Sequence, residues 1–231
     1  MAKEDGTWQL YYWPKLAGRA EFVRIIFEEV GEKFTEINDL DVLVPMFRHG
    51  KVEGWPCLTP PMIKKGDFQL CQTPVVCKYL GKEFGLYPEN SVDEAKAEQV
   101  NATIHDYIGE GRLAFHGKNF MMSYYQQQEE TKPYIKTFVE TRLPRYLEHF
   151  EKLLRANDNG DGFVIGKRLT YVDLGLLHVL RATESQFPDS WKSFENIPKL
   201  KAFKDRIAAR PRLADYFKSD RCKPFEGNSM M

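Results

Sequence analysis

Net charge and long apolar runs are both absent from this sequence. Among its 231 residues, 33 Lys and Arg balance 33 Asp and Glu. A chain without excess positive charge is a poor match for nucleic acid or an anionic membrane surface. No apolar run approaches the ~20 residues of a membrane-spanning helix. The N-terminal MAKEDGTW also lacks the apolar core of a secretory signal. We therefore expect no nucleic-acid partner, no membrane partner and no export.

Cysteine is scarce and unpaired in its spacing. The four cysteines are Cys57, Cys71, Cys77 and Cys222, and none form a CxxC pair. Zinc sites and CxxC redox sites both depend on paired spacings. Cys71 and Cys77 lie within an apolar pattern instead. We therefore expect reduced, mostly buried thiols in a cytoplasmic protein, and no metal site.

One stretch, NDNGDG from Asn157 to Gly162, imitates the start of a calcium-binding loop. An EF-hand needs an acid at its first position and a bidentate glutamate at its twelfth. Here those positions hold Asn157 and Arg168. The charges are wrong for calcium, and we interpret the stretch as a loop between helices.

What is present in the first 85 residues is an alternation of strand and helix patterns. A strand over residues 8–13 ends at Pro14, and apolar residues at helical spacing run from Arg19 until Gly31 stops them. A second strand is expected at 34–37, a hairpin at 62–64 and 68–71, and a helix at 74–84. Residues 39–61 are rich in breakers, and we expect an irregular loop there with one helical turn.

The sequence pattern changes after this α/β unit. Residues 85–94 read as a linker, and the remainder to residue 231 is helical in pattern with short breaks. Thr170 and Asp173 fit a capping box before an apolar run that contains His178, which we expect in the core. The prediction is an α/β domain over residues 1–84, a linker at 85–94 and an all-α domain over 95–231.

Five motifs occur in order along the chain. They are Tyr12-Trp13-Pro14 at a strand end, Gly18-Arg19 opening the first helix, Pro60-Pro61 before a hairpin, Gln72-Thr73 opening a helix, and GKRLTYVD at 166–173. Together they closely resemble the cytosolic glutathione S-transferases, over about residues 8 to 225, and within them the tyrosine-dependent branch (alpha, mu, pi, sigma). The resemblance implies a thioredoxin-like N-terminal domain, an all-helical C-terminal domain, and a cytoplasmic homodimer active in detoxification.

The resemblance also assigns a role to Gln72 and Thr73. In that family a Gln-Ser or Gln-Thr pair holds the γ-glutamyl carboxylate of glutathione at a helix N-terminus. Thr73 followed by proline is a good helix start, with Thr73 expected as the cap. Free N–H groups and the helix dipole at such a terminus favour an anion.

Tyr12 matches the catalytic tyrosine of the family, whose phenol hydrogen-bonds the glutathione sulfur. A free thiol has a pKa near 8.5, so little of it is thiolate at neutral pH. A donated hydrogen bond stabilises the thiolate, which can attack an electrophilic carbon without a metal or redox cofactor. Tyr11 is the rival, but adjacent strand residues face opposite sides of the sheet. The family spacing Tyr-aromatic-Pro favours Tyr12.

Further glutathione-binding residues follow from the same resemblance. Arg19 matches an arginine that supports the site electrostatically. Pro61 aligns with the family's cis-proline, and the preceding residue usually offers both N–H and C=O to the cysteinyl part of glutathione. That residue is Pro60, which has no N–H, a departure that leaves only the C=O half of the contact. An alternative register makes Pro60 the cis residue and Thr59 the contact.

Other positions are matched less closely. For the glycine carboxylate the loop offers Arg48, Lys51 and Trp55, of which we favour Lys51. An acid from the partner subunit is expected to be Asp106 or Glu110. The electrophile pocket is expected between Tyr12 and an aromatic- and Met-rich segment, with its wall formed by Tyr107 and Phe115 and covered by the tail at Phe225.

The sequence therefore predicts a glutathione transferase that conjugates glutathione to hydrophobic electrophiles, with glutathione as co-substrate and no cofactor. Two alternatives stay open. One is a sigma-like glutathione-dependent isomerase, which would consume no glutathione. The other is a non-catalytic module with the same fold that serves ligand carriage or protein assembly. Retention of Tyr12, Gln72 and Thr73 argues against the module, and Pro60 argues mildly for it.

Overall fold

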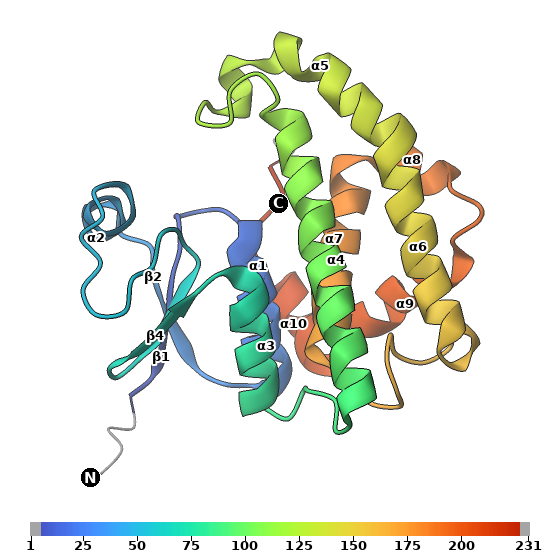
Figure 1. The fold of residues 1–231 in the computed structure, drawn as a ribbon, viewed down its shortest axis with the longest axis horizontal. Coiled ribbons are helices and arrows are strands. Elements are labelled where there is room, and N and C mark those ends of the chain that lie inside the picture. Colours follow the sequence, from blue (N-terminus) through green and yellow to red (C-terminus); the bar gives the residue numbers. More distant parts are fainter. Residues whose placement is uncertain (1–5, 227–231) are drawn as a thin grey trace.

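A four-stranded sheet forms the first unit of the structure, a computed structural model that describes residues 6–226 (Figure 1). Its spatial order is β2-β1-β3-β4, and β1 is parallel to β2 and antiparallel to β3. The strands are β1 (Trp8–Tyr11), β2 (Phe34–Ile37), β3 (Met62–Lys65) and β4 (Phe68–Cys71). The predicted strands and hairpin are confirmed. β1 ends two residues early, although the Tyr12 N–H still donates to the Ile37 carbonyl at 3.1 Å.

Helices cover both faces of this sheet. Figure 1 shows α1 and α3 between the sheet and the second unit, and α2 on the far side. Their bounds are α1 (Glu21–Val30), α2 (Leu40–Leu43) and α3 (Thr73–Glu83). As predicted, α1 ends at Gly31, whose φ of 74° suits glycine. The loop after β2 is more helical than expected, because α2 continues into a π-helical turn over Val44–Arg48.

The second unit is entirely helical, which confirms the predicted fold class. Its helices are α4 (Ser91–Phe115), α5 (Gln128–Thr137), α6 (Leu143–Ala156), α7 (Tyr171–Gln186), α8 (Pro188–Ser193), α9 (Pro198–Ala208) and α10 (Pro211–Lys218). α4 starts inside the stretch expected to be linker, because Asn90 caps it by accepting a hydrogen bond from the Asp93 N–H at 2.9 Å. A π-helical turn at Phe138–Arg142 joins α5 to α6 in one curved rod (Figure 1).

Helix α7 is the centre of the helical unit. The predicted capping box is present: the Asp173 carboxylate accepts from the Thr170 N–H at 2.7 Å and also from the Val164 N–H at 2.7 Å. His178 is fully buried, as expected. The stretch that imitates a calcium loop is an inter-helix turn, in which the Asn157 amide donates to the carbonyls of Phe163 and Gly166 at 2.8 Å.

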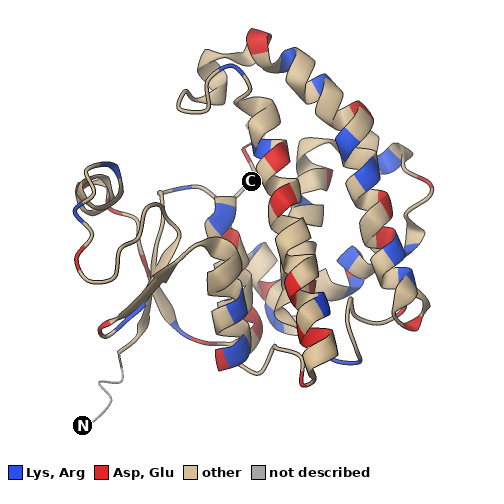
Figure 2. Ribbon diagram, in the orientation of Figure 1, with Lys and Arg blue, Asp and Glu red and all other residues tan. Residues whose placement is uncertain are grey.

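The two units share one packed boundary. The Phe22 ring of α1 lies 4.6 Å from the His105 ring on α4 and 4.5 Å from the His178 ring on α7. On α3, a Cβ at Gly81 would meet Tyr171 at 3.0 Å, so these helices approach closely. Acidic and basic residues are interspersed along the helices (Figure 2). Within residues 6–226, no helix is long and apolar enough to cross a membrane.

Candidate active site

Tyr12 is buried at the end of β1, beneath the turn that leads into α1. Its hydroxyl oxygen accepts a hydrogen bond from the Arg19 N–H at 2.9 Å. Burial raises the pKa of the Tyr12 phenol, opposed by the Arg19 N–H and by the positive charges of Arg24, Arg19 and Arg112. The phenol therefore keeps its proton at neutral pH. Because the Arg19 bond uses only an oxygen lone pair, that proton is available for another acceptor.

Gly18 allows the turn to pass this close to Tyr12. A Cβ at Gly18 would lie 2.2 Å from the Tyr12 hydroxyl oxygen and 2.9 Å from the ring. The residue also has a φ of 50°, which L side chains rarely adopt. The Gly18-Arg19 pair is therefore a geometric requirement: glycine gives the space, and the next N–H reaches the phenol.

Tyr11, the rival candidate, makes a different contact. Its hydroxyl donates to the Gln9 side chain two residues earlier, at 3.0 Å, and the side chain is half-buried. Burial raises the pKa of Tyr11 as well.

A cavity of about 280 Å³ lies at the N-terminus of α3. Five of the residues expected to bind glutathione line it, namely Arg19, Pro60, Pro61, Gln72 and Thr73, together with Thr59, Pro74, His105 and Asp106. Tyr12 is not among the residues that line this cavity, and its connection to the cavity is through Arg19, a lining residue whose N–H donates to the Tyr12 hydroxyl. The cis bond joins Pro60 to Pro61, so Pro61 is the cis-proline and the alternative register is wrong.

The backbone at the start of α3 differs from the expected cap. The helix begins at Thr73 itself and Gln72 takes the N-cap position, so the expected cap at Thr73 is corrected. Gln72 has a φ of 70°, which is uncommon for a residue other than glycine and is typical of functional sites. No side chain in the described part of the chain caps this terminus. Pro74 has no N–H, and the N–H groups of Val75 and Val76 both donate to the Gln72 carbonyl at 2.9 Å. Within the described residues, the backbone donor left at this terminus is therefore the Thr73 N–H, on a residue that lines the cavity.

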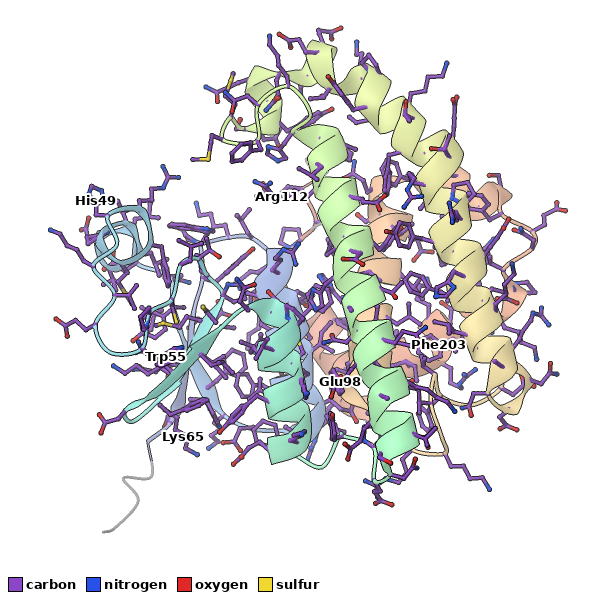
Figure 3. The ribbon with its side chains drawn as sticks, in the orientation of Figure 1. His49, Trp55, Lys65, Glu98, Arg112 and Phe203 are labelled. Carbon is purple, nitrogen blue, oxygen red and sulfur yellow. The ribbon has the colours of Figure 1, made fainter. Side chains whose placement is uncertain are left out.

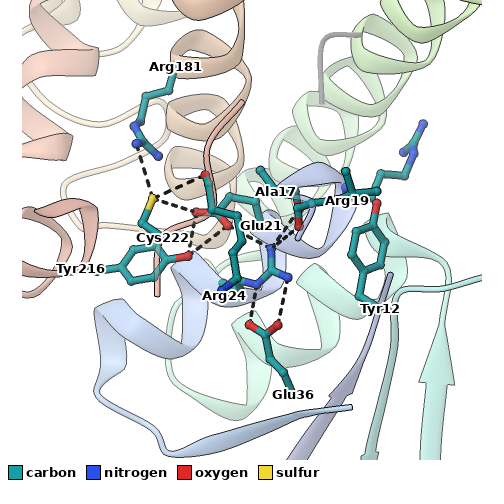
Figure 4. Close-up of polar contacts among 11 residues, drawn as sticks. Tyr12, Ala17, Arg19, Glu21, Arg24, Glu36, Arg181, Tyr216 and Cys222 are labelled. Atoms are coloured by element: carbon teal, nitrogen blue, oxygen red, sulfur yellow. Dashed lines mark hydrogen bonds and ion pairs between the residues drawn. The ribbon is translucent and has the colours of Figure 1, made fainter. Parts of the chain in front are cut away.

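A buried network fixes the turn that carries Gly18 and Arg19 (Figure 4). The Arg24 guanidinium donates to the carbonyls of Leu16 and Ala17 at 3.1 and 3.0 Å. It also donates to Glu36 at 2.6 Å and to Glu21 at 3.2 Å. The sequence interpretation missed Arg24, although an acid and a base three residues apart beside an apolar helix face were a usable signal.

The loop candidates for the glycine carboxylate lie away from this cavity. Lys51 is exposed and is not among the residues that line it. Trp55 is 70% exposed, and Figure 3 places it in the sheet unit. The Arg48 guanidinium lies 5.6 Å from the centre of the Trp13 ring. The structure therefore does not bring Lys51 together with Gln72 and Thr73.

Asp106 and Glu110, the two acids proposed for the site, have different surroundings within the chain. Asp106 lines the cavity of its own chain. Glu110 accepts two hydrogen bonds from Arg142 at 2.7 Å and one from Tyr146 at 2.6 Å. The Arg142 guanidinium lowers the pKa of Glu110. Glu110 is thus engaged in a contact between α4 and α6.

Tyr107 and Phe115 lie in the core instead of along a cleft. Tyr107 is fully buried, and its hydroxyl is 2.7 Å from the Thr183 hydroxyl. Phe115 is 2% exposed and packs against Tyr124 at 5.1 Å. Both rings occupy the face of α4 that meets the other helices, so neither is open to a ligand here. The Phe225 ring lies 6.0 Å from the His178 ring.

Comparisons with known proteins agree on one family. A model of the glutathione S-transferase C-terminal domain matches residues 115–220. Glutathione S-transferase P 1 of Xenopus laevis is 30% identical over 91% of this chain and 92% of that protein. The protein of the same name from Bufo bufo is 31% identical over 91% and 93%. Glutathione S-transferase of Plasmodium falciparum (isolate 3D7) is 28% identical over 90% and 93%. A solved structure described as NaGST-2 has a TM-score of 0.72 over 93% of this chain and 97% of that one, at 23% identity, which shows the shared fold.

Proposed function

The chain is an enzyme of the glutathione S-transferase family, and we propose that it conjugates glutathione to hydrophobic electrophiles with Tyr12 stabilising the thiolate. One observation carries this proposal. The Arg19 N–H donates to the Tyr12 hydroxyl at 2.9 Å, and Arg19 lines a cavity together with Gln72 and Thr73. A phenol with a free proton is therefore one residue contact away from a cavity suited to a peptide-like anion.

The energy required of Tyr12 is modest. Lowering a thiol pKa from near 8.5 by about 2 units needs ~2.7 kcal/mol, at ~1.36 kcal/mol per unit. A hydrogen bond to a charged acceptor supplies ~1.5–3 kcal/mol. One phenol therefore provides most of the effect, and the nearby positive charge of Arg19 adds to it.

Glutathione binding is assigned to the cavity walls. The γ-glutamyl carboxylate would lie at the N-terminus of α3, where Gln72 and Thr73 supply donors. The Pro60 carbonyl would accept from the cysteinyl N–H, but Pro60 has no N–H to return. The pair of backbone contacts is thus reduced to one at this residue. Thr59 lines the same cavity and offers a hydroxyl nearby.

The electrophile would approach on the side of Tyr12 that faces α4. Tyr107 and Phe115 are buried, so the wall belongs to other residues of that helix. Arg112 lies near the upper end of α4 (Figure 3), and its charge acts on both the Tyr12 phenol and the Arg19 guanidinium. A cation here would favour electrophiles that gain negative charge during thiolate attack.

The decisive experiment compares Tyr12→Phe with Tyr11→Phe. We expect the wild-type protein to be retained on immobilised glutathione and to conjugate 1-chloro-2,4-dinitrobenzene. Tyr12→Phe should lower kcat/KM by about 100-fold, which corresponds to ~2.7 kcal/mol, with a much smaller change in glutathione affinity. Ultraviolet absorbance of the thiolate should show the pKa of bound glutathione rising by about 2 units.

Tyr11→Phe is the matched control, because it removes a phenol oxygen from the neighbouring residue. Its kinetics should stay near those of the wild type. If Tyr11→Phe carried the loss instead, the assignment of the phenol would be off by one residue. Product analysis also separates conjugation from isomerisation, since only conjugation consumes glutathione.

We further propose a cytoplasmic homodimer, as the resemblance to the family implies. Light scattering coupled to gel filtration would give about twice the 26.9 kDa of one chain. A monomer that retained full activity would contradict this part of the proposal.

A further inference from the structure

His105 brings a group from the helical unit into the wall of the proposed glutathione cavity. It lies on α4, and its Nδ1 is 3.3 Å from Nη1 of Arg19, which belongs to the sheet unit. Both residues line the cavity. A guanidinium can only donate, so Nδ1 must be the acceptor and the imidazole proton must reside on Nε2.

The second ring nitrogen of His105, Nε2, is left without a hydrogen bond within the described residues, which is energetically unfavourable. Nε2 of His105 is buried and has no hydrogen-bond partner within residues 6–226. A buried N–H without an acceptor is unfavourable, so a purely structural histidine would be expected to satisfy it. The ring is held by Phe22, whose centre is 4.6 Å away, and it keeps Nδ1 directed at Arg19.

The imidazole is also neutral in this environment. Burial and the adjacent Arg19 charge lower the pKa of His105 to about 3. Arg19 is the charged group that acts on it, His105 in turn acts on the buried His178 of α7, and Asp106 borders the same cavity. Neutrality is required for the contact, because a protonated imidazole has no acceptor and would repel the guanidinium.

We propose that His105 is a positioning residue of the glutathione site, whose Nδ1 orients the Arg19 guanidinium within the cavity. The proposal rests on the function proposed above. The second terminal nitrogen of the guanidinium also lies against α4, because a Cβ at Gly109 would be 3.8 Å from Nη2 of Arg19. With Nη1 engaged by His105, the Arg19 guanidinium is fixed against α4, and Arg19 lines the cavity beside Gln72 and Thr73. The cavity is therefore complete only when α4 is packed against the sheet unit.

Three substitutions at His105 separate orientation from packing. In asparagine the Oδ1 atom stands as many bonds from Cα as Nδ1 does in histidine, whereas the acceptor of glutamine is one bond further, like Nε2. We expect His105→Leu and His105→Gln to raise KM for glutathione by about 10-fold, the scale of one charge-assisted hydrogen bond. His105→Asn should recover most of the affinity. KM for 1-chloro-2,4-dinitrobenzene should change little in all three.

The pH dependence provides a second readout. Because the imidazole stays neutral, KM for glutathione should have the same pH dependence near pH 6–7 in the wild type and in His105→Asn. A change in KM that occurs in the wild type near this pH and is absent from the variant is not expected. Such a change would mean that His105 titrates in the working range, which would overturn the proposal. Equal losses in the Asn, Gln and Leu variants would also overturn it, because they would indicate loss of packing alone.

A double-mutant cycle keeps the test valid if His105→Leu is poorly folded. If His105 acts through Arg19, the penalty of His105→Asn, Gln or Leu should vanish in an Arg19→Leu background, once folded fractions are matched by circular dichroism. Additive penalties would contradict the proposal. Failure of the inference about His105 can be distinguished from failure of the proposed function. A wild type that conjugates glutathione and needs Tyr12, but is insensitive to His105, refutes only this inference.

Discussion

Gly18 shows how much of the site depends on one missing methyl group. A Cβ there would lie 2.2 Å from the Tyr12 hydroxyl oxygen, well inside van der Waals contact. Gly18→Ala should therefore displace the phenol or the turn that carries Arg19. We expect kcat/KM for conjugation to fall at least as far as in Tyr12→Phe, with KM for glutathione also raised because Arg19 moves.

Gly50→Ala is the matched control for this substitution. Gly50 has a φ of 67°, so alanine pays a similar backbone strain of ~1–2 kcal/mol, but a Cβ there would meet nothing within 4 Å. Stability should fall in both variants, and further in Gly18→Ala because of the clash with Tyr12, as measured by urea unfolding. Activity should fall only in Gly18→Ala. Comparable activity losses would mean that backbone strain, and not contact with Tyr12, is responsible.

At the scale of elements, α1 and α10 are joined by a buried carboxylate. The Tyr216 hydroxyl lies 2.9 and 3.0 Å from the two Glu21 oxygens, and Glu21 is fully buried (Figure 4). Burial raises the pKa of Glu21, against the opposing effects of Arg24 and Tyr216. Tyr216→Phe removes a donor that no water can replace. We expect the free energy of unfolding to fall by ~1–3 kcal/mol.

Tyr146→Phe provides the comparison for this contact. The Tyr146 hydroxyl donates to Glu110 at 2.6 Å, but that carboxylate is 35% exposed and also pairs with Arg142. Water can replace the lost hydroxyl there, so its loss should cost about 0.5 kcal/mol. Denaturant titrations of the two variants measure the difference. Equal losses would show that burial does not set the strength of the contact between α1 and α10.

Sequence patterns predicted the elements and the local motifs of the site, because those depend on neighbours along the chain. Gln72 and Thr73 are adjacent in the sequence. The Pro60-Pro61 pair identifies the position of the cis peptide bond by residue type alone. The contact between Arg19 and His105 joins residues 86 positions apart, and no local pattern announces it. The prediction that Tyr107 and Phe115 form the wall of the electrophile pocket was wrong for a related reason. A segment rich in aromatics does not reveal which face of its helix meets the core, and packing of α4 against α6 and α7 decided it.

For the molecule as a whole, the boundary between the two units contains histidines that are held neutral. Burial lowers the pKa of His178 well below its usual range, and burial together with Arg19 lowers that of His105 to about 3. The unfolded chain binds protons at both sites below pH 6.5, while the folded chain does not. The stability that these groups contribute is thus fully present above pH 6.5. It is lost progressively as the pH falls toward about 3.

The free energy of unfolding should therefore decrease on acidification by up to ~1.4 kcal/mol per pH unit for each excluded proton. Buried carboxyls oppose this slope, because burial raises the pKa of Glu21 and raises that of Asp173 to about 6. The difference between the wild type and His105→Asn isolates one imidazole from those carboxyls. Urea titrations between pH 5 and 7 should give a flatter pH dependence for the variant, by about one proton. Parallel curves would show that His105 is already protonated in the folded protein, and Arg19 would then lack its acceptor.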